Sequence, residues 1–342
     1  MIKFYTNFNE LTPKNRTRVF PMLFDWFYVP NPKLKEYFEW VENIEEADVC
    51  VLPIDLGYYF IHNKKNELND FVLKAQEANK IVWVYSAGDF GTTLKDDVIT
   101  FRLGGFHSKM NASTYVMPSF INNPYQTILK DDIWKPLEKK DKPTIGFVGN
   151  ADGSLLKWSK ELVIHLNRIY KKLIKKDFTD KQSFFPSSTI RFRMLKKLQK
   201  SLLVNSNFIY RNKYRAGATT ELQKQLTTQE FYKNIEKNLY TFCLRGSGNF
   251  SVRFYETLIM GRIPLLIDTD VRLPFHDQID WTNRVVWVNT NNYERELVDF
   301  HARHTNEQLK EIQIKNRELA LSQLNRVEYF CKIAMYHSKD KI

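Results

Sequence analysis

The segment that most constrains the fold lies between residues 239 and 267. An apolar strand, a glycine-containing turn, a short helix and a second apolar strand follow one another there, with the strands expected at Leu239–Leu244 and Ile263–Ile267. Ser251 is a favourable N-cap and Gly261 a favourable helix stop, so the helix is expected between them. This order makes one βαβ half of a nucleotide-binding parallel sheet. The turn consists of Arg245, Gly246, Ser247, Gly248 and Asn249.

The turn has the chemistry of a phosphate site. Free backbone N–H groups at a helix N-terminus attract phosphate, and glycines let the backbone approach it. Arg245 precedes the turn and Arg253 stands in the first turn of the helix. A cation is disfavoured near a helix N-terminus because the macrodipole is positive there. Arg253 therefore needs an anionic partner, which would be either a ligand or an acid of this chain such as Glu256.

Glu256 lies one helical turn further along and has two interpretations. It could accept hydrogen bonds from the two ribose hydroxyls of a nucleotide, or it could be an ordinary exposed or salt-bridged acid. Its apolar neighbours, which indicate a buried helix, weaken the second interpretation; they are Phe254, Tyr255, Leu258 and Ile259.

Two other patterns in the same segment leave alternatives open. Residues 246–251 nearly fit G-x-G-x-x-G, with Ser251 in the place of the third glycine, and Asp268 follows Gly248 by 20 residues. A dehydrogenase holds its ribose-binding acid at that spacing, so an NAD-dependent oxidoreductase is the alternative function. Asp268 and Asp270 also form a D-x-D pattern, which holds a divalent metal in some transferases, although acids at strand ends are often structural. Three histidines lack metal-ligand spacing: His107, His165 and His276.

Strands and helices alternate in the rest of the chain, which predicts an α/β fold with parallel sheets. Four domain segments are expected. Residues 1–125 form an N-terminal Rossmann-like domain and the proline-containing polar residues 126–143 form a linker. Residues 144–304 form a second Rossmann-like domain that binds the nucleotide. Residues 305–342 follow as one long helix, from Thr305 to about His337, with the option of packing back across the domains.

Individual elements of these domains can also be placed. A new strand at Thr144–Val148 runs into Gly149 and Asn150, and the helix after it has leucine and isoleucine on one face from Leu155 to Leu173. In the N-terminal domain, strands are expected at Ile2–Tyr5, Ala47–Pro53, Lys80–Tyr85, Val98–Leu103 and Tyr115–Met117, with a helix at Glu67–Ala78.

Positive charge is concentrated in one segment. The chain carries a net charge of +12, and Lys157–Arg215 holds 16 basic and 3 acidic residues, which leaves 35 basic and 36 acidic residues elsewhere. Such a segment suits an anionic partner, and a solvated helical face is the alternative. Nucleic acid is not expected, because zinc-finger spacing and an RNP-like motif are missing. We expect an anionic membrane surface or an acidic, lipid-linked acceptor.

The sequence also bears on the compartment. It has no run of about 18 apolar residues that would span a membrane. The first residues do not form a secretory signal. Cys50, Cys243 and Cys331 are far apart and are expected to be buried thiols. A cytoplasmic protein is expected, with peripheral attachment to the inner face of a membrane as an option.

The segment around the turn resembles the signature of the exostosin-type glycosyltransferases of family GT47. The resemblance covers about 50 continuous residues, and Ile190-Arg191 with Leu195 is similar to a weaker family segment. One departure is Leu244, where the family usually has proline. The matching residues are Arg245, Gly246, Ser251, Arg253, Phe254, Glu256, Leu258, Gly261, Ile263, Pro264, Leu273, Pro274, Phe275, Asp280 and Trp281.

The resemblance implies a GT-B architecture, in which two Rossmann-like domains face a cleft and the second one holds the donor nucleotide. It implies an inverting transfer from a nucleotide sugar, most often a UDP-sugar, to a hydroxyl of a glycan or lipid-linked glycan in polysaccharide biosynthesis. Enzymes of this architecture do not in general need a metal, so no cofactor beyond the nucleotide-sugar co-substrate is expected. The residues expected to bind it are Gly149, Asn150, Arg245, Gly246, Ser247, Gly248, Asn249, Ser251, Arg253 and Glu256.

The implied mechanism assigns roles to these residues. Arg245, Arg253 and the helix N-terminus would stabilise the charge of the leaving nucleoside diphosphate. Inversion needs one group to accept the proton of the acceptor hydroxyl. Asp89 is the expected base because it stands in a glycine-flanked loop after a buried strand, and Asp55 and His107 compete with it. A loop-capping role for Asp89, and a non-enzymatic polyanion-binding protein, remain the alternatives.

Overall fold

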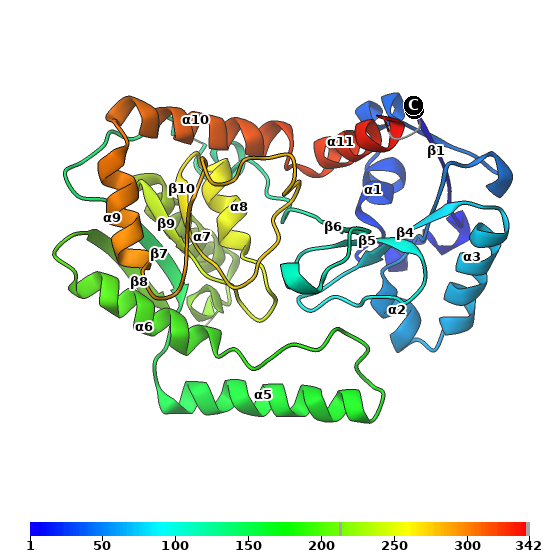
Figure 1. Ribbon diagram of the computed structural model, residues 1–342, viewed down its shortest axis with the longest axis horizontal. Helices are drawn as coiled ribbons and strands as arrows, with labels where there is room; N and C mark the ends of the chain where they lie inside the picture. The colour runs from blue at the N-terminus through cyan, green and yellow to red at the C-terminus, as the bar shows by residue number, and fades with distance from the viewer. Residues whose placement is uncertain (131, 212–213, 340–342) are drawn as a thin grey trace.

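The computed structural model describes residues 1–130, 132–211 and 214–339. It consists of two α/β domains side by side, each built on a parallel sheet (Figure 1). The strands of the N-terminal sheet pair in the order β2-β1-β3-β4-β5-β6, and every pair is parallel. They are β1 Ile2–Tyr5, β2 Phe38–Trp40, β3 Val49–Val51, β4 Ile81–Ser86, β5 Val98–Arg102 and β6 Thr114–Val116. Its longer helices are α2 Leu56–Ile61 and α3 Lys65–Glu77, and α1 is the single turn Pro21–Leu23.

The C-terminal sheet pairs in the order β11-β10-β9-β7-β8 and is also parallel throughout. Its strands are β7 Thr144–Asn150, β8 Asn205–Arg211, β9 Tyr240–Cys243, β10 Ile263–Ile267 and β11 Val286–Val288. The helices of this domain are α5 Leu155–Leu173, α6 Ser187–Lys200, α7 Glu221–Lys237, α8 Val252–Ile259, α9 Tyr293–Arg303 and α10 Asn306–Ser322. A short helix, α4 Pro124–Thr127, lies between the two domains in the chain.

The prediction of an α/β fold with two Rossmann-like domains that face a central cleft is confirmed. The expected βαβ unit is present as β9, α8 and β10, and all residues of both strands are buried. Strands of a parallel sheet are covered on both faces, which is why they can be recognised as continuous apolar runs. Gly261 ends α8 with a φ of +60°, as expected for a glycine after a helix.

The strand order creates a crevice in the C-terminal domain. β7 lies between β8 and β9, so the chain leaves β7 toward one side of the sheet and returns to its other side. The carboxyl ends of β7 and β9 therefore flank a topological switch point, where open α/β sheets bind ligands. Residues 149–150 and the turn after β9 meet at this point.

The expected single C-terminal helix is divided into α10 and α11 Arg326–Lys339. Asn325 starts the second helix, because its side-chain oxygen accepts a hydrogen bond from the backbone N–H of Glu328 at 3.0 Å. Helix α10 packs against α8, whereas α11 lies on the N-terminal domain next to α1 (Figure 1). The Tyr329 hydroxyl donates to the carbonyl of Val116, and Arg326 pairs with Asp25. The chain thus ends by crossing back between the domains.

Helix α5 and the loop after it make a second link between the domains. The helix lies apart from both sheets, below the two domains in the view of Figure 1. In the following loop, Asp180 pairs with Arg102 at 2.7 Å and Phe178 stacks on Phe60 with ring centroids 4.9 Å apart. Among the helices of the described ranges, none is long and apolar enough to cross a bilayer.

Candidate functional site

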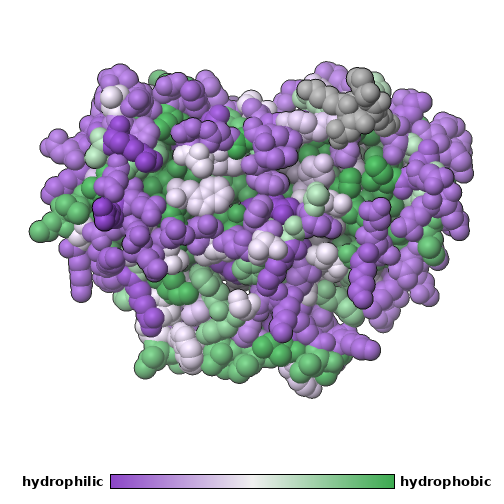
Figure 2. All heavy atoms as spheres, in the orientation of Figure 1, coloured by the Kyte–Doolittle hydropathy of each residue, from purple (hydrophilic) through white to green (hydrophobic). Residues whose placement is uncertain are grey.

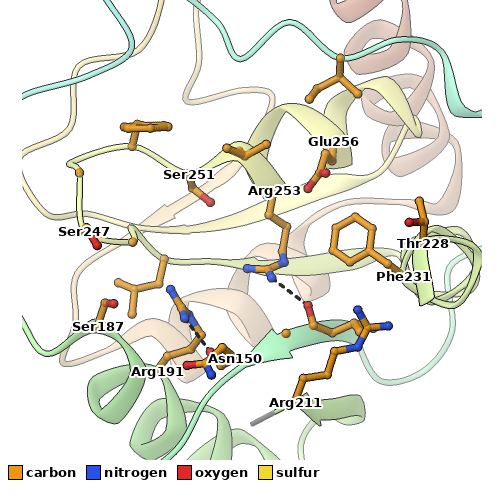
Figure 3. Close-up of a pocket in the computed structure, with 18 of the residues that line it drawn as sticks. Asn150, Ser187, Arg191, Arg211, Thr228, Phe231, Ser247, Ser251, Arg253 and Glu256 are labelled. Atoms are coloured by element: carbon orange, nitrogen blue, oxygen red, sulfur yellow. Dashed lines mark hydrogen bonds between the residues drawn. The ribbon is translucent and has the colours of Figure 1, made fainter. Parts of the chain in front are cut away.

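A cleft with a volume of ≈ 1010 Å³ opens at the switch point, and both domains line it. The N-terminal domain contributes Asp89 and residues 120–122. The carboxyl end of β7, the turn after β9 and the start of α8 contribute the opposite wall, and α5, α6 and α7 contribute further side chains (Figure 3). Nine of the residues expected at the site line this cleft: Asp89, Gly149, Asn150, Gly246, Ser247, Gly248, Ser251, Arg253 and Glu256.

The other two expected residues, Arg245 and Asn249, lie behind the cleft wall. Arg245 is 4% exposed, and its guanidinium donates to the side chain of Gln182 at 2.8 Å and to the carbonyl of Ser247 at 2.7 Å. Asn249 is fully buried, and its amide donates to the carbonyls of Gly105, Thr269 and Asp270 at 2.9 to 3.0 Å. Both residues shape the turn instead of facing the cleft.

One of the two glycines of the turn, Gly248, allows a contact between the domains. A Cβ atom on Gly248 would lie 2.2 Å from the carbonyl oxygen of Asp89, so only glycine allows the two loops to touch. Gly246, by contrast, has open space around it. Ser251 occupies the N-cap position of α8 with an extended backbone, but its hydroxyl does not cap the helix. Its side chain lines the cleft instead (Figure 3).

Three arginines converge on the cleft from different elements (Figure 3). Arg253 on α8 donates to the carbonyl of Val148 at 2.8 Å and packs over the ring of Phe147. Arg191 on α6 donates to the carbonyls of Asn150 and Arg245 at 2.7 and 3.0 Å. Arg211, the last residue of β8, pairs with Glu230 at 2.5 Å.

The charge of these arginines is incompletely balanced by the protein. Within the part of the chain that the structure describes, Arg191 and Arg253 donate hydrogen bonds only to backbone carbonyls and form no ion pair. Their buried Nε atoms have no hydrogen-bond partner among the described residues, and the same holds for Arg211 and for Arg245 behind the wall. Burial, together with the charge of Arg253, lowers the pKa of Arg191 to about 9, so its guanidinium is still protonated at neutral pH. Buried cations without full compensation are costly, and an anion in the cleft would relieve that cost.

Arg191 and Arg211 were not expected at the site. Arg191 belongs to the weaker family segment in the sequence, but no role followed from it. Arg211 ends a strand next to β7, and a side chain at that edge of the sheet faces the crevice once the strand order is known. Helix α7, which supplies Phe231 and Tyr232 to the cleft, was not predicted, because the sequence around residues 219–228 is polar and rich in threonine and glutamine. The signal that would have identified it is the capping box formed by Thr220 and Gln223.

Glu256 lies one turn beyond Arg253 on the same wall of the cleft. Burial raises the pKa of its carboxyl group from 4.5 to about 7, against the opposing effects of the Arg253 charge and a hydrogen bond from the Tyr232 hydroxyl. The carboxyl group is therefore able to change its protonation state near neutral pH. In its ionised form it can accept two hydrogen bonds from neighbouring hydroxyls of a ligand.

Asp89 faces the cleft from the loop after β4. Burial raises the pKa of its carboxyl group, and the charge of Arg168 counteracts part of that effect. The competing candidates lie elsewhere: Asp55 is at the start of α2, and the His107 ring accepts a hydrogen bond from Arg272 at 3.1 Å. Of these three candidates, Asp89 alone lines the cleft.

The two acids of the D-x-D pattern have structural roles: Asp268 stabilises a local turn, and Asp270 holds a contact between the two domains. A carboxylate oxygen of Asp268 accepts a hydrogen bond from the backbone N–H of Asp270 at 2.8 Å. The carboxylate of Asp270 accepts from the backbone and the hydroxyl of Ser108. Neither acid lines the cleft. Over residues 1–130, 132–211 and 214–339, no three His, Cys, Asp or Glu side chains are grouped as a metal site would require.

Comparison with known proteins finds a family match to part of the C-terminal domain. Residues 187–302 match the Exostosin GT47 domain, which confirms the resemblance seen in the sequence around the turn. The chain is 33% identical over 60 residues to the probable glucuronosyltransferase GUT1 of Oryza sativa subsp. japonica, and 34% identical over 58 residues to the probable beta-1,4-xylosyltransferase IRX10L of Arabidopsis thaliana. These matches span 18% and 17% of the chain and only 14% of each relative.

Among solved structures, the chain is similar to a glycosyltransferase from Rickettsia africae ESF-5. The sequences are 11% identical, the alignment covers 97% of each chain, and the TM-score is 0.38.

Proposed function

We propose that this chain, whose residues 187–302 match the Exostosin GT47 domain, is a glycosyltransferase that binds a nucleotide sugar in the cleft. The observation that carries the proposal is the convergence of Arg191, Arg211 and Arg253 on one cleft, where Arg191 and Arg253 donate only to backbone carbonyls of the described chain. A diphosphate supplies the charge and the acceptor oxygens that such a cluster needs.

The donor is proposed to be a UDP-sugar. Its diphosphate would lie at the arginines and at the N-terminus of α8, where the backbone N–H groups and the helix dipole favour negative charge. Glu256 would accept hydrogen bonds from the ribose hydroxyls. Arg245 would act indirectly, since its bond to the carbonyl of Ser247 holds the shape of the turn. The choice of uridine rests on the family resemblance.

The proposed reaction is a single in-line displacement with inversion. The acceptor hydroxyl attacks the anomeric carbon, the bond to the diphosphate breaks, and the hydroxyl proton passes to a base. Asp89 is proposed as that base because it faces the cleft from the opposite domain and because a raised pKa makes its carboxylate a stronger base. The arginines would stabilise the charge that develops on the leaving diphosphate. No resident cofactor is assigned to the reaction.

The acceptor is proposed to be a hydroxyl of a glycan or of a lipid-linked glycan. The N-terminal wall of the cleft, at Asp89 and residues 120–122, is the side from which it would enter. The basic segment Lys157–Arg215 is proposed to face an anionic surface or the acidic part of such an acceptor. Residues 212 and 213 of that segment lie outside the described residues.

A thermal-shift panel with UDP, GDP, CMP and NAD tests the proposal. A ligand at 100 times its dissociation constant adds about 2.7 kcal/mol of stability. We expect UDP to raise the melting temperature of the wild type and of the control Arg295→Ala, an exposed arginine on α9, but not of Arg253→Ala. Stabilisation by NAD alone would contradict the proposal and favour the alternative function, an NAD-dependent oxidoreductase. No response to any nucleotide would favour a polyanion-binding protein.

A further inference from the structure

Helix α5 presents its apolar side to solvent and its polar side to the protein. None of its residues is buried, and Leu155, Leu173 and Val163 are 84%, 76% and 64% exposed. Leu156, Leu166 and Tyr170 are also more than half exposed. At 100° per residue, these six side chains fall within one arc of the helix. Figure 2 shows the result as a hydrophobic band along the lower edge of the molecule, where Figure 1 places α5.

Polar contacts on the inner side fix this orientation. Arg168 pairs with Asp177 at 3.4 Å and its guanidinium packs on the ring of Phe90 in the N-terminal domain. Lys172 also pairs with Asp177, at 3.3 Å. Glu161 accepts a hydrogen bond from the backbone N–H of Ser188 at 3.4 Å. Turning the apolar side inward would break these contacts and bury charges, so the exposed apolar side belongs to the folded state.

The charges around the apolar side indicate what covers it. Between Leu155 and Lys176 the chain has seven basic residues and one acidic residue. Lys160 and Lys171 are exposed beside the apolar arc, and Lys175 and Lys176 are exposed just beyond the end of the helix. A helix with a wide apolar face and a lysine-rich polar border is typical of helices that lie in the interface of an anionic bilayer. A second copy of this chain fits less well, because two such helices would bring their lysines together.

We propose that α5 binds the surface of an anionic lipid bilayer by embedding its apolar face among the acyl chains. The interaction does not depend on the proposed enzymatic activity, because none of the six apolar side chains lines the cleft. It also differs from attraction by charge alone, since the apolar side chains must leave water.

The position of α5 has a consequence that rests on the proposed function. Lys157 and Glu161, on the inner side of the same helix, line the cleft together with Asp89. A helix is about 10 Å across. With a bilayer on the outer side of α5, the lipid headgroups would therefore lie about one helix diameter from the cleft. An acceptor carried on a lipid could then reach the cleft without leaving the membrane.

Vesicle flotation tests the proposal. The probes are vesicles of phosphatidylcholine with 30% phosphatidylglycerol and vesicles of pure phosphatidylcholine. The variant is Leu166→Ser with Leu173→Ser, and the matched control is Leu222→Ser with Leu226→Ser, which removes two equally exposed leucines from α7. We expect the wild type and the control to float with the anionic vesicles. We expect the affinity of the α5 variant for these vesicles to fall by at least about tenfold. Equal binding of the two variants would overturn the proposal.

Insertion is measured separately from electrostatic adsorption. The three native cysteines are buried, so Leu166→Cys offers one accessible thiol for an environment-sensitive dye, and Leu226→Cys is its control. We expect a several-fold rise in emission at position 166 on adding anionic vesicles and no change at 226. Binding without a rise, fully reversed by salt, would show charge attraction alone and contradict insertion. If the wild type forms a dimer without lipid and the α5 variant is a monomer, the apolar face binds a second copy of the chain, which would contradict the bilayer proposal. The UDP-induced thermal shift of the same variant reports the donor site independently.

Discussion

Replacing Glu256 by glutamine should remove a loss of stability that the wild type suffers as pH rises toward neutrality. In the folded protein the pKa of this carboxyl group is raised from 4.5 to about 7, mainly by burial. The folded state therefore keeps a proton that the unfolded chain releases between these two values. Stability is highest at the acidic end of this window and is lost as pH rises through it, until the loss is complete above the folded pKa.

The magnitude follows from the two pKa values. Between pH 5 and pH 8 they predict that the free energy of unfolding falls by about 2.5 kcal/mol on account of Glu256 alone. Glutamine has nearly the same shape and does not ionise, so Glu256→Gln lacks this dependence. The stability of the variant relative to the wild type should rise by that amount from pH 5 to pH 8. For a domain of 150–250 residues, each kcal/mol corresponds to about 2–4 °C in melting temperature.

The assay is a series of thermal melts of both proteins from pH 5 to pH 8, compared as differences at each pH so that other titrating groups cancel. Glu221→Gln, which alters a glutamate whose side chain is 82% exposed on α7, is the control and should track the wild type. A difference between Glu256→Gln and the wild type that stays constant within about 0.5 kcal/mol would refute the reasoning, because it would mean that the cleft does not penalise the ionised carboxylate.

Three further predictions concern the cleft and the turn. Asp89→Asn should lower kcat by about 10²-fold or more while leaving the UDP-induced thermal shift unchanged, and full activity would exclude Asp89 as the base. In calorimetry, wild-type protein should bind UDP more tightly than 2′-deoxy-UDP, and Glu256→Gln should lose that preference. If the variant keeps the preference, Glu256 does not contact the ribose hydroxyls. Asn249→Ala should reduce the free energy of unfolding in urea by about 2–3 kcal/mol, because the carbonyls of Gly105 and Thr269 lose their side-chain donor. A loss below about 0.5 kcal/mol would contradict that role.

The sequence was most informative where structure is determined locally. The unit β9–α8–β10 could be placed to within a few residues, because buried parallel strands are apolar runs and Gly261 marks the end of the helix between them. Strand β2 was missed: its three residues, Phe-Glu-Trp, are too few for a periodic pattern. The break between α10 and α11 was missed as well, since the apolar pattern continues across it and only the capping contact of Asn325 interrupts the helix.

Tertiary structure decided which residues share a site. Arg191, Arg211 and Arg253 are distant in the chain and meet only because β7 lies between β8 and β9, a strand order set by long-range pairing. Packing of the two domains against each other likewise put the Asp89 loop against Gly248 and left Arg245 behind the wall.

The clearest contrast is helix α5. The sequence by itself determined that this segment is an amphipathic helix, because side-chain spacing and helical period are local properties. It did not determine which face turns inward. Apolar periodicity ordinarily indicates the face that packs on a core, but here ion pairs at Asp177 and the ring of Phe90 hold the polar face against the protein. The contact between Arg168 and Phe90 joins residues of both domains, so only the folded chain decides that the apolar side remains outside.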